Sequence, residues 1–471
     1  SYIKDFDIVS EIKPGGTFLL NTTWKGAELE EHLPNKVKRT IAERGIKFYT
    51  IDATEIAAEL GLCNRTNTVL QSAFFNLSGV LPAADAIEYM KAAIIKRYSK
   101  KGQKVVDMNC SAVDRGATAA VAIDVPASWK DLKDEVKVVD ESLPYYIREI
   151  QIPVNNQAGD TLPVSVFLPY ADGVVPVETT KYEKRGIATD VPKWIPENCI
   201  GCNQCALVCP HAAIRPFLFT EEEAKAAPAG CETKKAIGKG FEKYTYRLQV
   251  DPLDCQGCGS CANVCPAKNK ALVMEPLESQ LPEQANWDYC LTLSEKENPM
   301  DKFTVKGSQF QRPLYEFNGS CAGCGEAPYM KLMTQLFGDR MYIADATGCT
   351  YVVGSSTPSF PYATNSKGQG PAPSNSLFEN NAEYSLGMCL SVEQRRKQMK
   401  AHAEALVAST ADAALKAATE AWLADGDDGD KTRAVSEALA AALKATADTG
   451  ADAKFLLDNE DQLVKKSMWM Y

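Results

Sequence analysis

The chain of 471 residues carries 51 Lys and Arg against 61 Asp and Glu, and this formal net charge of −10 argues against a nucleic-acid-binding surface. No apolar run approaches the length of a membrane span and the first residues show no signal-peptide pattern, so we expect no membrane segment. The 16 cysteines, most of them regularly spaced, indicate a reducing compartment poor in oxygen, and the length predicts about three domains.

Residues 1 to about 120 have an α/β pattern. Thr17–Asn21 and Ile46–Asp52 have the composition of short buried strands, and Ala83–Tyr98 has helical periodicity that continues from Val105 to Val113. Because the first strand comes so early, we expect the sequence to start inside a domain. From 125 to 198, eight prolines interrupt any long helix, and Leu162–Leu168 predicts a short strand in an extended connector.

Two cysteine runs follow, at residues 199–210 and 255–266, and each matches the bacterial ferredoxin spacing C-x2-C-x2-C-x3-C-P. Three thiolates on one tight loop cap three irons of a cubane, whereas the fourth, beyond a longer gap, ligates the other cluster. We therefore assign one [4Fe-4S] centre to Cys199, Cys202, Cys205 and Cys265, and a second to Cys255, Cys258, Cys261 and Cys209.

Other chemistry fits these runs less well. Gly201, Gly257 and Gly259 allow backbone N–H groups to approach the sulfurs, as an iron-sulfur loop requires. Zinc also binds CxxC pairs but has no use for a fourth cysteine followed by proline, and a disulfide framework suits a small secreted chain. The long insert at 211–250, which ends in the strand-like Tyr244–Val250, is expected to help shape a docking surface.

A second chemical stretch begins with Cys321-Ala-Gly-Cys324 and continues to Cys349, which follows the strand-like Met341–Ala344. A lone CxxC is typical of both redox pairs and zinc sites. A third cysteine after a buried strand favours an iron-sulfur or other metal site, with one ligand missing. From 391 to about 450 the chain is Ala-rich and helical, and we interpret the acidic interruption at 424–430 as a solvated turn, because it lacks the remaining calcium ligands of an EF-hand.

Taken together, these residues resemble an internal part of the pyruvate:ferredoxin (flavodoxin) oxidoreductases, the single-chain 2-oxoacid:acceptor oxidoreductase family. The stretches that carry the resemblance are residues 180–188, 199–216, 319–326, 346–349, 365–371 and 375–382. The fold that it implies is an α/β multidomain arrangement. Its parts are an α/β coenzyme-A-type domain (1–124, N-terminally truncated), an extended linker (125–190), a ferredoxin-like α+β module with two [4Fe-4S] clusters (191–285), and part of a thiamin-diphosphate-binding α/β domain (300–471, C-terminally truncated).

The resemblance implies oxidative decarboxylation of pyruvate with coenzyme A to acetyl-CoA and CO2. Electrons would pass from thiamin diphosphate, bound with Mg2+, through three [4Fe-4S] clusters to ferredoxin, flavodoxin or a fused reductase. It further implies a homodimer in the cytoplasm or in the matrix of an anaerobic mitochondrion-like organelle. A polyferredoxin-type electron carrier and the same enzyme class acting on another 2-oxoacid are the alternatives.

The resemblance also implies roles for individual residues. Cys321, Cys324 and Cys349 would hold the cluster nearest the thiamin, with a fourth ligand outside this sequence, while Glu326 and Cys349 would touch thiamin diphosphate. An acid such as Glu326 ahead of Ala327-Pro328 is also typical of a helix start. The magnesium motif and the pyruvate-binding residues are expected outside the sequence, so we predict no catalytic residue here and no turnover by this chain alone.

Asn67 and Asn109 fall where coenzyme A contacts are expected, although Asn is more often a helix cap or a solvated residue. Two positions depart from the family. Asp345 stands where Asn is more usual, and Val353-Gly-Ser355 replaces Trp-Gly-Gly, so substrate preference or reduction potential is expected to differ. We interpret Cys63, Cys110, Cys231, Cys290 and Cys389 as isolated buried thiols, and His211 as a loop histidine.

Overall fold

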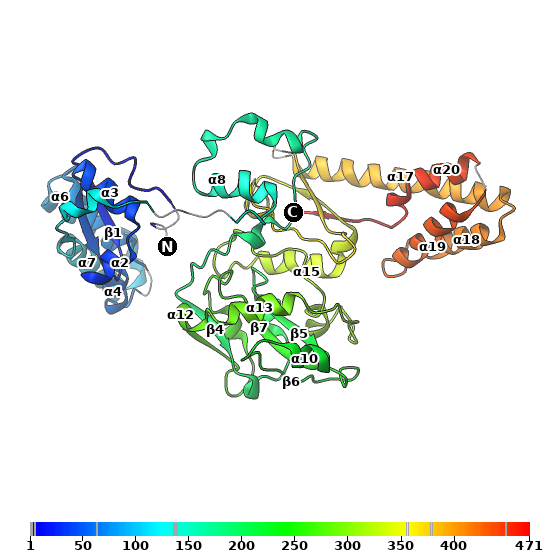
Figure 1. The fold of residues 1–471 in the computed structure, drawn as a ribbon, viewed down its shortest axis with the longest axis horizontal. Coiled ribbons are helices and arrows are strands. Elements are labelled where there is room, and N and C mark those ends of the chain that lie inside the picture. The colour runs from blue at the N-terminus through cyan, green and yellow to red at the C-terminus, as the bar shows by residue number, and fades with distance from the viewer. Residues whose placement is uncertain are drawn as a thin grey trace. The chain divides into compact units, whose positions relative to one another are not determined.

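In a computed structural model the chain divides into two compact units, Ser1–Pro163 and Val164–Tyr471 (Figure 1). The structure describes residues 3, 6–62, 65–134, 140–354, 356, 358–376, 378, 380–447 and 450–471. Ser355, which belongs to a stretch discussed above, and Cys63 lie outside the described residues. The finer division into four domains stays a prediction.

The first unit contains a three-stranded sheet in the order β1-β2-β3, in which β1 and β2 are parallel and β3 is antiparallel to β2. Its strands are β1 (Thr17–Asn21), β2 (Lys47–Ile51) and β3 (Val121–Ala122). Its helices are α2 (Ala27–His32), α3 (Asn35–Arg44), α4 (Ala53–Glu59), α5 (Asn67–Ser78), α6 (Ala83–Tyr98) and α7 (Gln103–Thr118). Both predicted strands and the predicted helix are confirmed.

Two apolar clusters stabilise this unit. Ile41, Phe48 and Trp129 belong to a core between α3, β2 and the 3-10 turn η2 (Ala127–Asp131). A second core forms where α5 packs on α7, and there the Ser72 hydroxyl donates to the carbonyl of Val113 at 2.6 Å. The α/β character predicted from the apolar periodicity therefore has a packing basis.

The connector differs from the prediction at one point. Leu162–Leu168 is not a strand, because Val164–Tyr170 forms the 3-10 helix η5. Val164 and Leu168 are 88% and 70% exposed, and the prolines at 163 and 169 lack the N–H donors that strand pairing requires. The other short elements of the connector are η3 (Ile147–Gln151), α8 (Ile152–Asn155), η4 (Gly159–Thr161) and η6 (Thr179–Tyr182).

The cysteine runs lie in a ferredoxin-like part of the second unit, which has two antiparallel sheets, β4-β8 and β5-β7-β6. Its strands are β4 (Asp190–Trp194), β5 (Ile214–Phe219), β6 (Lys234–Lys235), β7 (Thr245–Val250) and β8 (Leu272–Pro276). Its helical elements are η7 (Pro196–Asn198), α9 (Gln204–Val208), α10 (Glu221–Ala226), α11 (Ser260–Val264), α12 (Leu277–Gln280) and α13 (Glu283–Leu291). The predicted strand at 244–250 is confirmed as β7.

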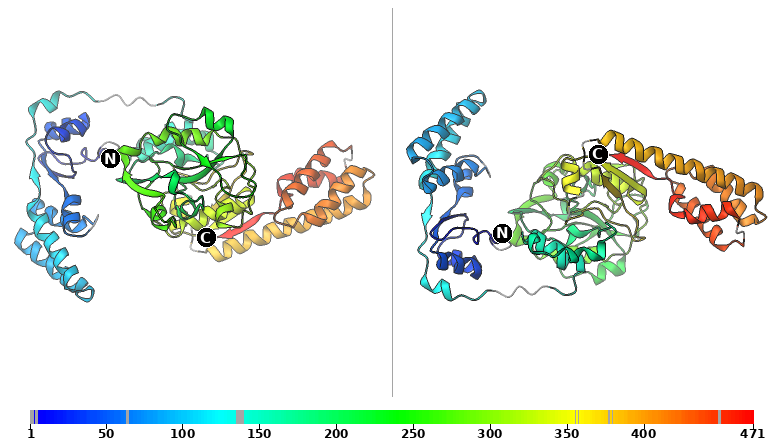
Figure 2. Two further views of the ribbon diagram at one scale, coloured as in Figure 1. Left: turned by 90° about the horizontal axis from the view of Figure 1, so that it is seen from below. Right: turned by 90° about the horizontal axis from the view of Figure 1, so that it is seen from above.

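The rest of this unit combines a parallel sheet, in the order β10-β9-β11, with a helical bundle. The strands are β9 (Met341–Asp345), β10 (Ala372–Asn375) and β11 (Ser467–Met470). The helices that precede or follow β9 in the sequence are α14 (Val305–Ser308), α15 (Ala327–Phe337), η8 (Gly338–Arg340) and α16 (Cys349–Gly354). The bundle contains α17 (Asn381–Ser409), α18 (Ala413–Asp425), α19 (Thr432–Ala445), α20 (Ala451–Asp458) and η9 (Glu460–Gln462). Both views of Figure 2 show α18 and α20 packed along the C-terminal half of α17.

Trp422 and Leu439 are among the buried residues that hold the bundle together. The predicted acidic turn is confirmed as the connection between α18 and α19, where Asp427 pairs with Arg396 at 3.0 Å. Among the described residues, no helix is both long and apolar enough to cross a bilayer.

Candidate functional site

The two cysteine runs share one local backbone. In each run the glycine two positions after the first cysteine has a positive φ, 64° at Gly201 and 65° at Gly257, and its N–H donates to that cysteine's sulfur at 3.4 Å. At Gly257 a Cβ atom would also lie 2.7 Å from the carbonyl oxygen of Asp190. The predicted role of these two glycines is confirmed, whereas Gly259 caps α11 with a φ of 73°.

The last cysteine of each run lies among the first three of the other run. Burial raises the pKa of Cys205, and the neighbouring thiolates that raise it further are those of Cys199, Cys202 and Cys265. Burial likewise raises the pKa of Cys261. The charges of neighbouring thiolates, which include Cys209, Cys255 and Cys258, raise it further. Both groupings are compatible with the crossed sets that the spacing predicts, although the charge of Cys205, from the other set, also acts on Cys261. The ligand sets stay a prediction.

The thiols fit a cluster core that carries positive charge. Burial removes water from the Cys255 sulfur and raises the pKa of this thiol to about 12. A thiolate at this position is therefore stable only where bound cations replace the solvation that burial removes. In the described part of the chain, no three His, Cys, Asp or Glu side chains are arranged around a single metal ion. In a cubane each thiolate has its own iron, and the crossed sets with N–H groups at the sulfurs suit that arrangement.

A buried lysine joins α15 to the end of the first run. The Lys331 ammonium, 1% exposed, donates to the carbonyls of Leu207 at 3.2 Å and Cys209 at 2.9 Å, and also to that of Ala206. Burial lowers the pKa of Lys331 to about 8, so the group remains mostly protonated at pH 7. Its charge satisfies the last carbonyls of α9.

The segment before α15 is attached to the same place. The Asn318 amide donates to the carbonyl of Pro210 at 2.8 Å, and the Phe317 N–H donates to that of His211 at 2.9 Å. His211 is buried, and its Nε2 lies 3.0 Å from the carbonyl oxygen of Ser320. Its ring therefore links the cluster run to residues 318–320 and is no ordinary loop histidine.

An ion pair reinforces this attachment. Arg215 donates to the Glu316 carboxylate, and both side chains are at least nine-tenths buried. The guanidinium lies 5.0 Å from the ring centre of Trp287 and 5.4 Å from that of Phe317. Neither this ion pair nor Lys331 was predicted from the sequence. For Lys331 a signal was available, because it lies on the same face of α15 as Ala327 and Thr334, which are both buried.

The loop at 321–324 shares with the cluster loops a glycine of positive φ two positions after its first cysteine. Gly323 has a φ of 73°, and the Glu326 N–H donates to the sulfur of Cys324 at 3.4 Å. A Cβ at Gly323 would lie 3.5 Å from the Cβ of Cys258, so this loop touches the loop of the second cysteine set. Cys321 is exposed and Cys349, also exposed, is the first residue of α16.

Glu326 is exposed and precedes α15 without a side-chain capping bond.

Asp345, the last residue of β9, is fully buried. Its carboxylate accepts a hydrogen bond from the Thr350 hydroxyl at 2.6 Å, while its Oδ2 has no hydrogen-bond partner in the described residues. Burial, and then the charge of Glu326, raises the pKa of Asp345. A thiamin role for Glu326 and Cys349 stays a prediction.

The two candidate coenzyme A residues show local roles. Asn67 is the exposed first residue of α5. Asn109 is half-buried in α7, where its amide donates to the carbonyl of Val105 at 2.8 Å. Both are compatible with the alternative of helix-associated asparagines, and coenzyme A binding stays a prediction.

The cysteines outside the cluster runs differ in burial. Cys290 is buried, as predicted, whereas Cys231 is only half-buried. Cys110 and Cys389 are also half-buried rather than fully enclosed.

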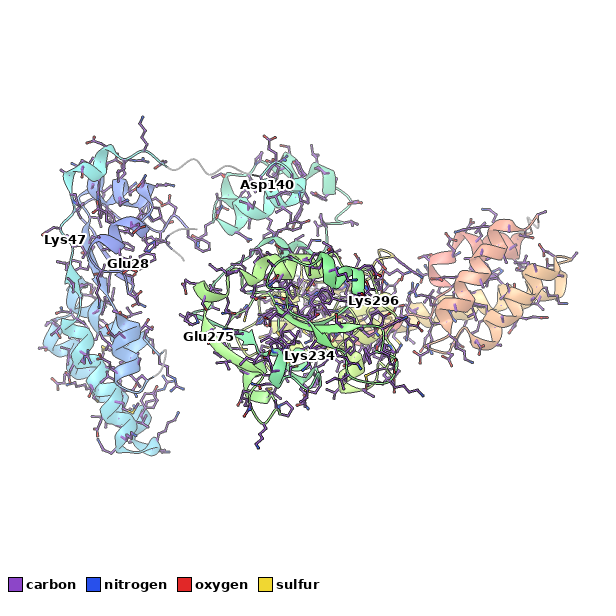
Figure 3. The ribbon with its side chains drawn as sticks, turned by 60° about the horizontal axis from the view of Figure 1, so that its bottom comes forward. Glu28, Lys47, Asp140, Lys234, Glu275 and Lys296 are labelled. Carbon is purple, nitrogen blue, oxygen red and sulfur yellow. The ribbon has the colours of Figure 1, made fainter. Side chains whose placement is uncertain are left out.

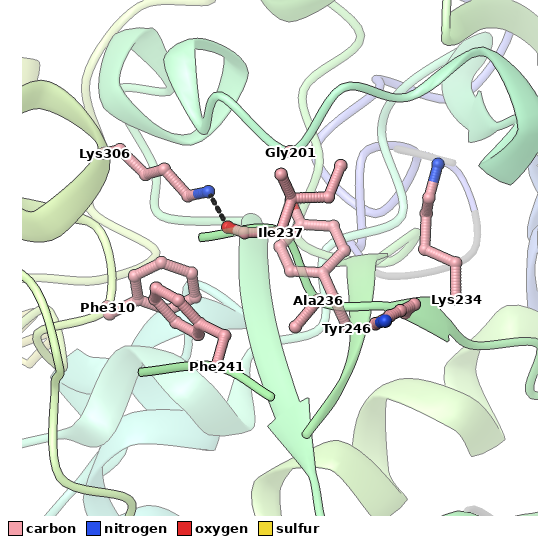
Figure 4. Close-up of a pocket in the computed structure, with 9 residues that line it drawn as sticks. Gly201, Lys234, Ala236, Ile237, Phe241, Tyr246, Lys306 and Phe310 are labelled. Carbon is pink, nitrogen blue, oxygen red and sulfur yellow. Dashed lines mark hydrogen bonds between the residues drawn. The ribbon is translucent and has the colours of Figure 1, made fainter. Parts of the chain in front are cut away.

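Lysines surround the first cysteine loop. Lys234 donates to the carbonyls of Pro196 and Cys199, both at 2.6 Å, and Figure 3 labels it. With Lys235 and Lys306 it lines a small cavity that also includes Gly201 (Figure 4). The Lys306 ammonium donates to the carbonyl of Ile237, the bond drawn in Figure 4. Cationic side chains therefore lie close to the loop of the first set.

The crossed cysteine sets define a ferredoxin-type dicluster protein, and residues 198–269 match the family of 4Fe-4S dicluster domains. Residues 1–119 match the family described as pyruvate ferredoxin/flavodoxin oxidoreductase, and 133–188 match a domain of unknown function. Over most of its length the chain is similar to a part of the pyruvate:ferredoxin/flavodoxin oxidoreductases.

Curated relatives agree with that assignment. The chain is 53% identical to a pyruvate-flavodoxin oxidoreductase of Enterobacter agglomerans over 93% of this chain and 37% of that protein. It is 49% identical over its whole length to 40% of a pyruvate:ferredoxin oxidoreductase of Moorella thermoacetica, and 40% identical to 26% of a mitochondrial pyruvate dehydrogenase [NADP(+)] of Euglena gracilis. The chain thus spans about two fifths of the length of the first relatives.

Proposed function

We propose that this chain is the electron-transfer section of an enzyme that converts pyruvate and coenzyme A to acetyl-CoA and CO2 and reduces ferredoxin or flavodoxin. The observation that carries the proposal is the pair of crossed cysteine sets with a third cluster-type loop against one of them. The named activities of relatives with 53% and 49% identity support the reaction and the acceptors.

The chemistry divides between cofactors and protein. Thiamin diphosphate with Mg2+ would supply the electron sink for loss of CO2, and the [4Fe-4S] clusters would accept electrons one at a time. The residues of this chain hold the sulfurs, exclude water from them and fix the spacing between the sites. Glu326 and Cys349 are the proposed thiamin contacts, and Asn67 and Asn109 the proposed coenzyme A contacts.

The proposed order of the electron path rests on one proximity and on one electrostatic interaction. The loop that carries Cys321 and Cys324 touches Cys258, so electrons would enter the set of Cys255, Cys258, Cys261 and Cys209 first. Cys205 is among the groups whose charge acts on Cys261, so the set containing Cys205 comes next. Lys331 and the Arg215–Glu316 pair keep these parts at fixed separation.

The acceptor would meet the protein near the first set. Lys234, Lys235 and Lys306 lie beside Gly201, and such cations favour the approach of an acidic electron carrier. We further propose that the enzyme is a homodimer of the cytoplasm or of an anaerobic organelle matrix.

The test is anaerobic iron and sulfide analysis of the whole native protein, with EPR after addition of pyruvate and coenzyme A. About twelve irons per chain with substrate-dependent reduction support a three-cluster enzyme. About eight irons that only dithionite reduces would instead indicate a polyferredoxin-type carrier and remove Cys321, Cys324 and Cys349 from the ligands. Reduction by a different 2-oxoacid and not by pyruvate would indicate the same enzyme class with another substrate.

A further inference from the structure

Residues 178–190, which we call the bridging segment, lie near the end of the connector. Up to residue 188 they belong to the stretch that matches a domain of unknown function. Their hydrogen bonds reach two parts of the second unit that are far apart in the sequence. One part surrounds the loop of Cys321 and Cys324, and the other is the run that begins with Cys255.

The first half of the bridging segment is attached to the sequence on both sides of the Cys321–Cys324 loop. The Glu178 N–H donates to the carbonyl of Tyr362 at 2.9 Å. The Thr180 hydroxyl, which is buried, donates to the carbonyl of Glu316 at 2.9 Å. The bridging segment therefore joins the chain before that loop to the chain after it.

The second half of the bridging segment is attached to the run of the second cysteine set. The Lys184 ammonium donates to the carboxylates of Asp251 at 2.6 Å and Asp254 at 2.7 Å. The Gly186 N–H donates to the carbonyl of Leu253 at 2.8 Å. Both carboxylates are buried, so each needs a partner in place of water, and Lys184 serves the two together.

Asp251 shapes the turn that leads into Cys255. One of its carboxylate oxygens accepts the N–H groups of Leu253 and Asp254, both at 3.2 Å. Its carbonyl accepts the Cys255 N–H at 3.0 Å. The other carboxylate oxygen accepts from Lys184. Lys184 is thus linked to the backbone of Cys255 through a single residue.

The backbone of Lys184 has a conformation that lysine rarely adopts. Its φ is 41°, in the left-handed region, where glycine is usual. A residue with a side chain keeps such a conformation only where the surrounding contacts hold it there. The ion pairs with Asp251 and Asp254 are such contacts, and the same ammonium lies 5.2 Å from the ring centre of Phe317.

We propose that the bridging segment fixes the second cysteine set relative to the Cys321–Cys324 loop, and that Lys184 is its positioning residue. Lys184 holds the turn before Cys255 through Asp251. It also places a positive charge beside the buried carboxylates of that turn, and a nearby positive charge favours the reduced form of a cluster. This inference rests on the proposed electron path, in which the second set is reduced first.

The first test uses glycine variants of the whole protein, purified anaerobically with its clusters. Glycine adopts a φ of 41° freely, so a lysine that only fills a turn can be replaced without loss. We expect Lys184→Gly instead to lower the thermal midpoint, followed by circular dichroism, and to accelerate hydrogen exchange in peptides from 178–190 and 251–258. The control Gln157→Gly, at an exposed residue with a φ of 61°, should not lower the midpoint. An unchanged or higher midpoint for Lys184→Gly would overturn the proposal.

The second test measures reduction potentials by titration followed by EPR. The signal of the second set is the one that Cys258→Ser removes. We expect its midpoint potential to be more negative in Lys184→Met than in Lys181→Met, which removes the same charge three residues earlier. Lys181 pairs with Glu178 at 2.8 Å and is the matched control. Equal potentials in the two variants would contradict a positioning role for Lys184.

Iron analysis and added pyruvate separate the remaining outcomes. If Lys184→Met lacks about four irons that Lys181→Met retains, the turn before Cys255 has not formed and the inference is supported. If pyruvate reduces no cluster in the native protein while the Lys184 variants change as expected, the proposed reaction is wrong and the attachment remains. If pyruvate reduces the native clusters and the Lys184 variants match their controls, only the role of Lys184 is wrong.

Discussion

At the scale of single residues, the cluster sites depend on which thiols meet and on what surrounds them. Cys205 and Cys261 are each grouped with the last cysteine of the opposite run. Their N–H donors come from glycines with positive φ, a conformation that L side chains rarely adopt. The predicted sets therefore place sequence neighbours on different clusters, and this can be tested.

Replacing Cys209 with Ser should impair the cluster of Cys255, Cys258 and Cys261, although Cys209 belongs to the other run. Replacing Cys265 with Ser should impair the cluster of Cys199, Cys202 and Cys205. EPR of each reduced variant, with iron analysis, measures the loss, which is about four irons if the cluster is absent. Cys110→Ser, at a half-buried thiol outside both sets, is the control. Loss of the cluster of the variant's own run would contradict the crossed assignment.

Replacing Asp345 with Asn tests a buried carboxylate. Burial raises the folded-state pKa of Asp345, so the folded protein binds this proton more tightly than the unfolded chain does. Its contribution to stability is therefore lost as pH rises from its ordinary pKa of about 4 through the raised value. Asn keeps an acceptor for Thr350 and carries no charge.

The thermal midpoint of Asp345→Asn relative to the native protein should accordingly rise as the pH increases from about 4, the ordinary pKa of this carboxyl. Asp339→Asn, at a partly exposed carboxylate that pairs with Arg433 at 2.8 Å, is the matched control and should show no such rise. A midpoint difference for Asp345→Asn that is constant or falls with pH would count against a raised pKa.

At the scale of elements, α15 and the segment before it are joined to the cluster runs by buried polar contacts. Lys331 extends from α15 to the carboxyl end of α9, and the Arg215–Glu316 pair joins β5 to the segment before α15. Electron transfer requires fixed separations, and these buried polar contacts fix orientation more specifically than apolar packing does.

Replacing Lys331 with Met should leave the carbonyls of Ala206, Leu207 and Cys209 without their donor. Buried carbonyls without partners cost about 1–3 kcal/mol, so we expect the cluster-containing part to unfold at lower urea concentration. Visible absorbance of the clusters measures the midpoint. Lys302→Met, at a partly exposed ion pair with Asp430, is the control and should change little. Equal midpoints for the two variants would show that Lys331 is dispensable.

At the scale of the whole chain, two compact units have separate cores. The cores of residues 17–122 contain no cluster cysteine, whereas the ferredoxin-like core includes Cys205 and Cys261 among its buried residues. Removal of iron should therefore affect one unit selectively.

After anaerobic chelation of iron, hydrogen exchange should accelerate in peptides from 199–276 and remain unchanged in those from 17–122. The physical reason is that metal binding energy contributes to folding only where the ligands are. Mass spectrometry of the exchanged protein measures both regions in one sample. Uniform acceleration throughout the chain would mean that the units do not unfold independently.

The sequence by itself determined the iron-sulfur chemistry and the main strands and helices, and the crossed cysteine sets stay a prediction. Cysteine spacing and apolar periodicity are local, and β1, α6, β7 and β9 follow from them. The error at Leu162–Leu168 arose because strand pairing depends on neighbours that a local pattern does not contain.

Tertiary structure alone decided the contacts between distant segments. The Lys331 bonds to α9 and the Arg215–Glu316 pair each join residues from separate parts of the chain. Burial and charge neighbours set their chemistry, and both depend on how the elements pack. A sequence pattern specifies which groups are present, whereas packing decides which of them meet in the same dry environment.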